Sequence, residues 1–532
     1  MIQKNEMPTW MKTKGYIHVS KSLRISENWK SYKSKIENPA FVANYAFYPL
    51  LHSIIRERKY KKVNQSKHQN KTFRTHNFKL IEGGYEKTSK NRPLHYASHF
   101  DALIYGYYAS LISEKYENEL KKIKELNESI NAYRKIKVAP TKDEGKSTIH
   151  FANEVFEEIK RRGESEEVGV LTFDIKSFFS RLDHSILEKR WTNIMGFNEL
   201  PKDHKNVFKS CTQFRYILKD DLRIENIKSG RRKGFDEKKL CNIRKHKGYK
   251  CFFEDNKDFR EHIKSGKLRI YKNPFFQNKI NVGIPQGLPI SAVLANLYLL
   301  EFDKKIIENI VLKENGFYRR YSDDIILICN VNTLEKNKDY IENLIKESNL
   351  EISTEKTEKF IFKNTEYNLS NEKRLTSFKI QEKKEIKDAP LIYLGFEFRG
   401  YNVCIKSTNV AKFYRRLISI VKRRAKRAKK NNNPIIPKAM FKNQVKKLYK
   451  RTLRQLNNDH NEIKQVFRKK TFLVKNEKGE FDLISKKVDI KKQSNYFSYL
   501  NRCVKIFDSK LFIHQHRKKN HILNSAIKRY LK

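Results

Sequence analysis

Three acidic residues in the chain could together bind divalent metal ions. Asp174 follows the apolar run 168–173, and Asp323 and Asp324 stand side by side within the segment 317–329. Carboxylate oxygens are the ligands that Mg²⁺ prefers, and two such ions about 3.5–4 Å apart can bind the attacking and leaving oxygens of a phosphoryl transfer. Because these ions need their ligands at one point, the fold must bring distant parts of the chain together.

The residues around these acids predict a strand beside a hairpin. Residues 168–173 are β-branched and apolar, which suits a buried strand, and residues 317–329 predict two short strands around a tight turn at the acidic pair. Neighbouring residues of a strand point to opposite faces, so Asp323 and Asp324 can both point inward only at a turn. We expect Asp174 and Asp323 to bridge the ions directly and Asp324 to support them.

Further elements are predicted along the chain in less detail. Asp183 fits the N-cap of a helix, which explains the Asp183–His184 pair better than a catalytic role does. Residues 201–280 predict a long polar connection with no clear period. The remaining predicted elements are an aromatic helix over 105–116, a charged continuation over 121–130, an apolar helix over 289–300, an amphipathic helix over 341–350 and a hairpin over 391–399.

The charge balance of the 532-residue chain is strongly basic. Lys and Arg number 114 against 60 Asp and Glu, which gives a formal net charge of +54. Such an excess repels itself in a compact chain, and nucleic acid is the usual polyanion that neutralises it. Lysine usage inflates the figure, but it does not explain the segment 414–430, which has nine Lys or Arg and no acid. We expect this segment to form a helix that contacts phosphates through Arg415, Arg416, Arg423, Arg424 and Arg427.

The six cysteines and the N-terminus bear on the cellular compartment. The cysteines are scattered and form no CxxC motif, so we expect reduced thiols. The N-terminus lacks a signal-peptide pattern, and the apolar run 41–55 contains Asn44, Pro49 and His52 and is too short to span a bilayer. The expectation is a cytoplasmic protein without a membrane partner.

Five motifs occur in an order that identifies a resemblance. They are FDIKSFF at 173–179, GIPQGLPIS at 283–291, YRRYSDD at 318–324, LEISTEK at 350–356 and LGF at 394–396. Each alone is weak, but in this order they resemble the successive motifs of reverse transcriptases. The chain is most similar to the bacterial group II intron, retron and unknown-group branch. Within that branch, RPLHYASH at 92–99 resembles the defence-associated (antiphage) enzymes.

The resemblance implies roles at the nucleotide. Phe179 would block a ribose 2′-OH and so select dNTPs, although a Phe beside Phe178 could also be a core residue. Gln286 would pack against the incoming nucleotide, or could belong to a plain strand-to-helix turn. Lys356 could protonate or orient the leaving pyrophosphate, or could be a helix-end lysine. The triphosphate would be bound by Lys87, Lys90 and Arg92, of which Arg92 can bind two oxygens at once.

The same resemblance extends the metal and nucleic-acid sites. The metal ligands would be Asp174, Ile175, Asp323 and Asp324, holding two Mg²⁺ ions, and Mn²⁺ would fit the same oxygens. Tyr321 and Gly395 would contact nucleic acid from the YxDD motif and the primer-grip hairpin. Arg134 also falls at an arginine of the family, but the loop after it departs from the usual spacing.

The fold implied is α+β: a right-hand polymerase with helical fingers, an antiparallel-sheet palm and a basic helical thumb. We expect an N-terminal extension over 1–80, fingers over 81–165, a palm over 166–400 with a long insertion near 200–280, and the thumb and C-terminal region over 401–532. The function implied is an RNA-directed DNA polymerase in antiphage defence. It would use dNTPs, a cognate structured noncoding RNA and a DNA product, and a homo-oligomer is compatible with it.

Three alternatives stay open. An intron-type maturase fits the domain order, but there is no HNH-type nuclease pattern. A retron enzyme is a further alternative, but its usual NAxxH and VTG signatures are missing. A catalytically silent RNA-binding scaffold is the non-enzymatic alternative, although three carboxylates beside a polyanion are costly without metal. Related enzymes can start chains from a Tyr hydroxyl, and the sequence does not choose among its 27 Tyr residues.

Overall fold

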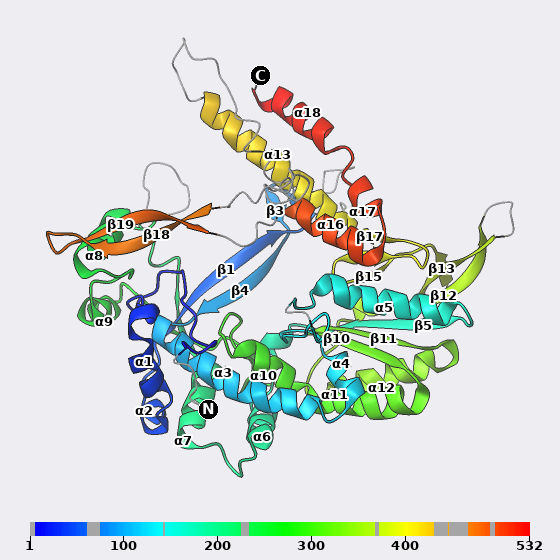
Figure 1. The fold of residues 1–532 in the computed structure, drawn as a ribbon, viewed down its shortest axis with the longest axis horizontal. Coiled ribbons are helices and arrows are strands. Elements are labelled where there is room, and N and C mark those ends of the chain that lie inside the picture. The colour runs from blue at the N-terminus through cyan, green and yellow to red at the C-terminus, as the bar shows by residue number, and fades with distance from the viewer. Residues whose placement is uncertain are drawn as a thin grey trace.

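The computed structural model describes residues 6–60, 75–141, 144–224, 234–367, 372–382, 384–429, 445, 467–489 and 495–531. The fold is α+β and has the form of a right hand (Figure 1). A large sheet flanked by helices forms the palm, a second sheet with helices forms the fingers, and C-terminal helices rise from the palm as the thumb.

The palm is built on a six-stranded antiparallel sheet. Its order is β10–β11–β5–β12–β13–β14, and alternate residues of its central strands enter two separate cores. One core contains Leu171 and Phe173 with the helices on one face; the other contains Val170 with those on the opposite face. The strands are β5 (Val168–Asp174), β10 (Phe317–Tyr321), β11 (Asp324–Asn330), β12 (Glu358–Tyr367), β13 (Glu372–Gln381) and β14 (Lys384–Lys387).

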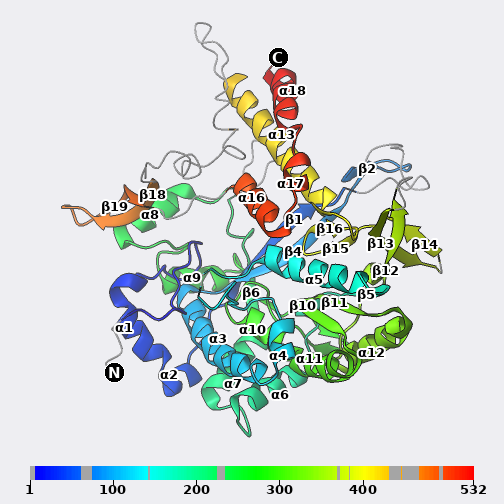
Figure 2. The same ribbon diagram turned by 45° about the vertical axis from the view of Figure 1, so that its right-hand side comes forward.

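Helices cover both faces of the palm sheet, as Figure 2 shows. One face carries α5 (Thr148–Gly163) and a three-stranded sheet of β15 (Leu391–Tyr393), β16 (Phe396–Phe398) and β17 (Val403–Ile405). The other face carries α3 (His99–Leu120), α4 (Lys124–Ser129), α6 (His184–Met195), α10 (Ser291–Tyr298), α11 (Leu300–Ile306), the π-helix Ile307–Leu312 and α12 (Leu334–Glu347).

The fingers sheet joins segments that the sequence analysis kept apart. Its order is β4–β1–β6–β7, from β1 (Leu50–Arg58), β4 (Ser89–Tyr96), β6 (Arg215–Leu218) and β7 (Tyr271–Lys272). The expected boundary at residue 80 therefore runs through one sheet, because β1 pairs with β4. The smaller fingers elements are α1 (Ile25–Ile36), α2 (Pro39–Ala43), and the ribbons β2 (Asn77–Lys79) with β3 (Tyr85–Lys87) and β8 (Phe276–Gln277) with β9 (Ile280–Asn281).

The expectation of an unpatterned connection over 201–280 is wrong. This part of the chain contains β6, β7, β8, β9, α7 (Lys202–Thr212), α8 (Glu237–Lys247) and α9 (Asn256–Lys264). Short helices around single aromatics such as Phe259 build a small core of their own, which periodicity over longer windows does not reveal. Strand β6 pairs in parallel with β1, so this segment completes the fingers sheet.

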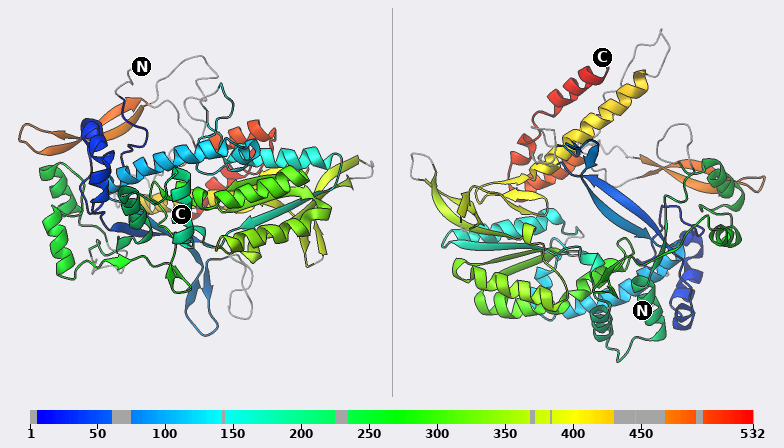
Figure 3. Two further views of the ribbon diagram at one scale, coloured as in Figure 1. Left: turned by 90° about the horizontal axis from the view of Figure 1, so that it is seen from below. Right: turned by 180° about the vertical axis from the view of Figure 1, so that it is seen from behind.

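The C-terminal region was expected to be helical, but it is not wholly so. It contains α13 (Ser407–Lys429), α16 (Tyr496–Phe507), α17 (Leu511–His514) and α18 (Lys519–Leu531), and also a ribbon of β18 (Phe467–Lys475) and β19 (Phe481–Asp489). The ribbon lies beside α8, far from α13, in both views of Figure 3. Residues 431–437, whose Asn and Pro residues predict a linker, lie outside the described residues.

Several other expectations about elements hold, with shifted bounds. The 317–329 and 391–399 hairpins are present, and Asp183 caps α6 through the amides of Ser185 and Ile186. The expected charged continuation over 121–130 is a separate helix, α4, and α12 begins at Leu334 rather than 341. Among the described residues, no helix is long and apolar enough to cross a membrane.

Candidate active site

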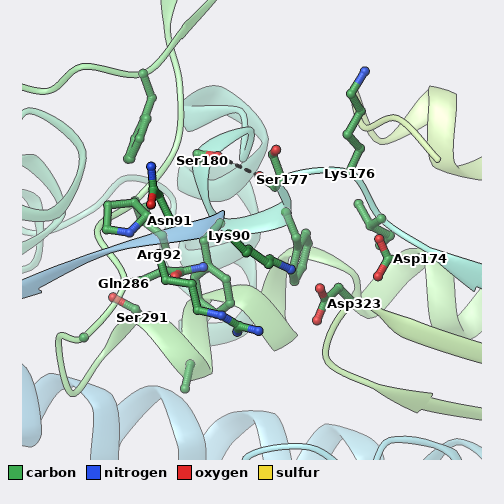
Figure 4. A pocket seen from close by; sticks show the side chains of 18 of the residues that line it. Lys90, Asn91, Arg92, Asp174, Lys176, Ser177, Ser180, Gln286, Ser291 and Asp323 are labelled. Carbon is green, nitrogen blue, oxygen red and sulfur yellow. Dashed lines mark hydrogen bonds between the residues drawn. The ribbon is translucent and has the colours of Figure 1, made fainter. Parts of the chain in front are cut away.

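A cavity of about 680 Å³ lies where the ends of the palm strands meet the fingers (Figure 4). It is bordered by residues of the strand β4, the end of β5, the 283–291 loop and the turn between β10 and β11. Its lining residues are Lys90, Asn91, Arg92, Pro93, Tyr133, Asp174, Ile175, Lys176, Ser177, Phe178, Phe179, Ser180, Phe275, Ile284, Gln286, Gly287, Leu288, Ser291, Ala292, Asp323, Ser353 and Lys356.

The structure brings Asp174 and Asp323 to one edge of this cavity. The amide of Ile175 donates a hydrogen bond to the carbonyl oxygen of Asp323 at 3.2 Å, so the two segments are directly adjacent. Ser322, at φ +63°, makes the tight turn that reverses the chain at Asp323. In Figure 4 the two carboxylates lie near one another and face the cavity. The strand-and-hairpin arrangement expected for these two acids is therefore present.

Asp324 has a different position from Asp323. It begins β11 and is the register partner of Asp174 across the sheet, and it is not one of the residues that line the cavity. Successive residues of the chain leave the turn on different sides. The side chain of Asp323 therefore points into the cavity, and that of Asp324 lies beside the cavity. This placement is compatible with the supporting role expected for Asp324.

Burial and neighbouring charges raise the pKa values of Asp323 and Asp324. Burial raises the pKa of Asp323, and the charge of Asp174 raises it further, while Lys90 opposes the shift. Desolvation raises the pKa of Asp324 to about 6, with added repulsion from Asp323 and Asp174. Carboxylates held together against their mutual repulsion form a site where a cation is favourable.

The residues of the cavity suit a metal ion whose remaining ligands come from a substrate. Among the described residues, no three His, Cys, Asp or Glu side chains converge into a metal-binding group. Mg²⁺ keeps several waters and is commonly bound by one or two carboxylates together with substrate phosphates. Asp174 and Asp323 provide two carboxylates, and Ile175, whose side chain is buried, could contribute its carbonyl oxygen.

Basic side chains surround the carboxylates. The Lys356 amino group lies 2.5 Å from a carboxylate oxygen of Asp174. Lys90 and Arg92 enter the cavity from β4, and the Lys90 amino group points toward the acids in Figure 4. Arg92 also lies 3.6 Å from Glu57 on the neighbouring strand β1. Lys176 also lines the cavity, so two acids are combined with four exposed cations, which suits a ligand that carries phosphates and metal together.

The motif around Phe179 is shaped by a left-handed residue. Ser177, at φ +53°, starts the short 3₁₀ helix Phe178–Ser180 and turns the two phenylalanines in different directions. Both phenylalanines border the cavity, but Phe178 is buried in the core, whereas Phe179 is half-buried. The alternative that Phe179 is simply a core residue therefore fits Phe178 better.

The 283–291 loop is attached to the fingers through its backbone. The amide of His95 on β4 donates to the carbonyl oxygen of Gln286 at 2.8 Å. Gly287 has φ +115°, and a Cβ atom there would lie 2.6 Å from the carbonyl oxygen of His95. Only glycine allows this approach, which holds Gln286 at the cavity.

Some expected site residues lie elsewhere. Lys87 is exposed on β3, outside the cavity lining, because the β2–β3 ribbon carries it away from β4. Tyr321 is not a lining residue either, and its ring lies 6.1 Å from that of Phe151. Gly395 forms the β15–β16 turn at φ +90°, where its carbonyl oxygen accepts a hydrogen bond from the Lys406 amide.

The arginines of α13 lie outside the cavity, on the thumb. Arg416, Arg423 and Arg427 are exposed and Arg424 is half-buried, while Leu417, Val421 and Ala425 form the buried face. Arg415 differs from the others, because its guanidinium stacks 3.8 Å from the ring centre of Tyr60 at the end of β1.

A buried network beneath the acidic turn was missed from the sequence. Arg320 is fully buried and forms two hydrogen bonds with Asp303, at 2.8 and 2.5 Å. Tyr318 donates to the same carboxylate at 2.7 Å, and Arg320 also donates to the carbonyl oxygen of Ser322 at 3.3 Å. Strand alternation places Arg320 on an inward face, but nothing in the sequence identifies Asp303 as its partner.

Comparisons with solved structures give remote likenesses. An apo telomerase from Candida tropicalis, truncated from the C-terminal domain, is 13% identical, with 60% of this chain and 53% of that chain covered and a TM-score of 0.35. A telomerase from Candida albicans in complex with a TWJ fragment of telomeric RNA is 12% identical, with 75% and 54% covered and a TM-score of 0.33. The chain spans about half the length of these proteins.

The family comparison is more extensive. No curated protein matches the chain. The model of the family described as reverse transcriptase (RNA-dependent DNA polymerase) matches residues 110–398, more than half of the chain, and this range includes Asp174, Asp323 and the loop at Gln286. The protein therefore belongs to the reverse transcriptase (RNA-dependent DNA polymerase) family.

Proposed function

We propose that the protein is an RNA-directed DNA polymerase and that Asp174 and Asp323 are its catalytic carboxylates. The observation that carries this proposal is the meeting of these two acids, from separate segments, in one cavity with Lys90 and Arg92. Phosphoryl transfer depends mainly on positioning and on charge stabilisation, and the cavity offers groups for both.

Different residues of the cavity contact different parts of the nucleotide. Lys90 and Arg92 bind the triphosphate, and the guanidinium of Arg92 leaves Glu57 for phosphate oxygens. Phe179 fills the space beside the sugar and excludes a 2′-OH, so dNTPs are preferred. Gln286, held by its backbone bond to His95, packs against the base pair that forms.

Asp174, Asp323 and the carbonyl oxygen of Ile175 would hold two Mg²⁺ ions, with Asp324 in support. When bound, the ions orient the attacking and leaving oxygens and neutralise charge on the phosphates. In the free protein Lys356 neutralises Asp174, and beside a bound nucleotide its ammonium group could stabilise the leaving pyrophosphate.

The proposals for the RNA partner and for the biological role are based on the sequence. The exposed arginines of α13 would contact RNA or the product duplex through phosphates. The resemblance of residues 92–99 to the defence-associated enzymes supports a role against phage with a cognate noncoding RNA. Sequencing the RNA that copurifies, and plating phage on cells with the wild type or Asp323→Ala, tests this role; equal plating would contradict it.

The polymerase activity is tested by extension of a DNA primer on an RNA template with labelled dNTPs and Mg²⁺. The wild type is compared with Asp323→Ala combined with Asp324→Ala, and with Asp339→Ala as a matched control at an exposed acid on α12. We expect extension by the wild type and the control alone. Equal activity, or equal inactivity, of the wild type and the double variant would overturn the proposal.

A further inference from the structure

Tyr133 has an unusual backbone conformation beside the acidic turn. Its φ is +64°, in the left-handed region that a bulky side chain rarely adopts. Its ring lines the cavity that contains Asp174 and Asp323, and 51% of the residue is exposed. A non-glycine residue held in this region persists only where its surroundings fix it, and such residues cluster at functional sites.

Arg134 fixes the loop to the helices α3 and α4. Its guanidinium binds both carboxylate oxygens of Glu117 on α3, at 2.8 and 2.7 Å. It also donates to the carbonyl oxygens of Asn127 at 2.6 Å and Ile130 at 2.8 Å. These bonds fill most of the donors of Arg134, so this arginine anchors the loop and does not reach a ligand.

The palm fixes the same loop from the other side. The amide of Asn131 donates to the carbonyl oxygen of Arg320 at 3.0 Å, and the side chain of Asn296 donates to the carbonyl oxygen of Ala132 at 2.9 Å. Asn296 belongs to α10, which follows the Gln286 loop, and Arg320 belongs to β10, which leads to Asp323. The loop is therefore tied to both motifs that form the cavity.

The hydroxyl group of Tyr133 is placed at the turn itself. It lies 3.1 Å from the hydroxyl group of Ser322, the left-handed residue that precedes Asp323. This bond fixes the far end of the ring, and the anchored backbone fixes the near end. Tyr133 is thus held at both ends while it lines the cavity.

From these contacts we infer that Tyr133 is a substrate-contacting residue whose ring stacks on a nucleoside, either that of the incoming nucleotide or that at the primer end. This inference rests on the proposed polymerase function. A loop that needed only the left-handed conformation would be less strained with glycine. An exposed aromatic ring in a cavity beside cations is a stacking surface for any base, independent of sequence.

The inference is tested with Tyr133→Gly, Tyr133→Leu and Tyr133→Phe in the full chain. Glycine relieves the strain at φ +64° but adds freedom to the unfolded chain, so Tyr133→Gly should melt close to the wild-type temperature while it lacks the ring. We expect Tyr133→Gly and Tyr133→Leu to raise the KM by about tenfold or more, with a smaller change in kcat, and Tyr133→Phe to keep the wild-type KM. A rise in KM for dNTP identifies the incoming nucleotide, and a rise for primer–template identifies the primer end.

A binding measurement separates this inference from the polymerase proposal. Fluorescence anisotropy with a labelled primer–template, with and without dNTP, reports stacking even if no DNA is made. Wild-type KM and wild-type binding in both Tyr133→Gly and Tyr133→Leu would overturn the inference while the polymerase proposal stands. The single variant Asp323→Ala is the control for the activity assay. Its loss of activity would show that the assay reports the active site.

Discussion

The palm beneath Asp323 and the contact between the fingers and the thumb both use ion pairs, but in opposite surroundings. In the palm, Arg320 and Asp303 are both fully buried. Between fingers and thumb, Glu57 on β1 pairs with Lys412 on α13 and lies near Arg92, and the side chains of both cations are more than half exposed.

The difference teaches what each region is built to do. A buried ion pair is costly to form and very costly to break, so the acidic turn is held in one geometry. Exposed pairs are weak and are screened by salt, so the cations near Glu57 can exchange it for a polyanion at little cost. Under the proposed function, the rigid region would hold the catalytic acids in place, and the exchangeable region would release its cations to the phosphates of nucleic acid.

The largest effect expected is on the buried pair. Asp303→Ala leaves the guanidinium of Arg320 buried without its partner and should lower the free energy of unfolding by about 3–5 kcal/mol. Chemical denaturation measures the change. Glu57→Ala, which breaks an exposed pair, is the matched control and should change stability by about 1 kcal/mol or less. Equal losses of unfolding free energy in the two variants would show that the two regions do not differ in this way.

The next effect concerns sugar selection in the cavity. Phe179→Val leaves space beside Phe178 and should lower the preference for dNTPs over rNTPs by about 10- to 100-fold, with little change in kcat for dNTPs. Steady-state kinetics with each nucleotide measures the ratio of kcat/KM values. A variant of the buried Phe178 should instead lose stability, and unchanged discrimination in Phe179→Val would assign Phe179 to the core.

A smaller effect is expected from the thumb helix. Arg423 and Arg427 are both exposed on α13, and replacing them with Gln would remove two of the proposed phosphate contacts. The slope of log K against log salt for single-stranded RNA should fall in magnitude by about 1.4, whatever the RNA sequence. Replacing exposed Lys336 and Lys346 of α12 in the same way should leave the slope as in the wild type. An unchanged slope in the α13 variant would place the RNA elsewhere.

The smallest effect is expected at the contact between thumb and fingers. Lys412→Gln should change the free energy of unfolding by about 0–1 kcal/mol at low salt, and the change should disappear at about 0.5 M salt. Thermal denaturation at both salt concentrations measures this. A loss that persists at high salt would mean that the contact is rigid, as the palm network is.

The sequence was sufficient for the parts of the site that depend on local pattern. The strand before Asp174, the hairpin at Asp323 and the half-buried Phe179 follow from alternation and from motif order. The partners that depend on tertiary packing could not be predicted this way. Nothing near Arg320 in the chain points to Asp303, and the role of Tyr133 depends on a left-handed φ that its residue type disfavours.

The fold shows the same division. In the palm, the strand before Asp174, the 317–329 hairpin and the helices α3, α10 and α12 were predicted with shifted bounds, whereas α5 and the strands β12, β13 and β14 were not predicted. The fingers sheet was not predicted, because β6 and β7 are short, and because β1, β6 and β7 are distant in sequence and pair only through tertiary contacts. Lys87 was placed at the nucleotide by the family resemblance, but it lies on the β2–β3 ribbon, outside the cavity lining.

The central claim is that Asp174 and Asp323 bind divalent ions jointly, and a Mn²⁺ titration followed by electron paramagnetic resonance tests it most directly. The wild type, Asp174→Asn, Asp323→Asn and the control Asp339→Asn are compared with primer–template and a non-hydrolysable dNTP analogue. The account predicts that each of the first two variants binds Mn²⁺ at least about tenfold more weakly than the wild type, and that the control does not. Wild-type Mn²⁺ binding in either Asp174→Asn or Asp323→Asn would contradict it.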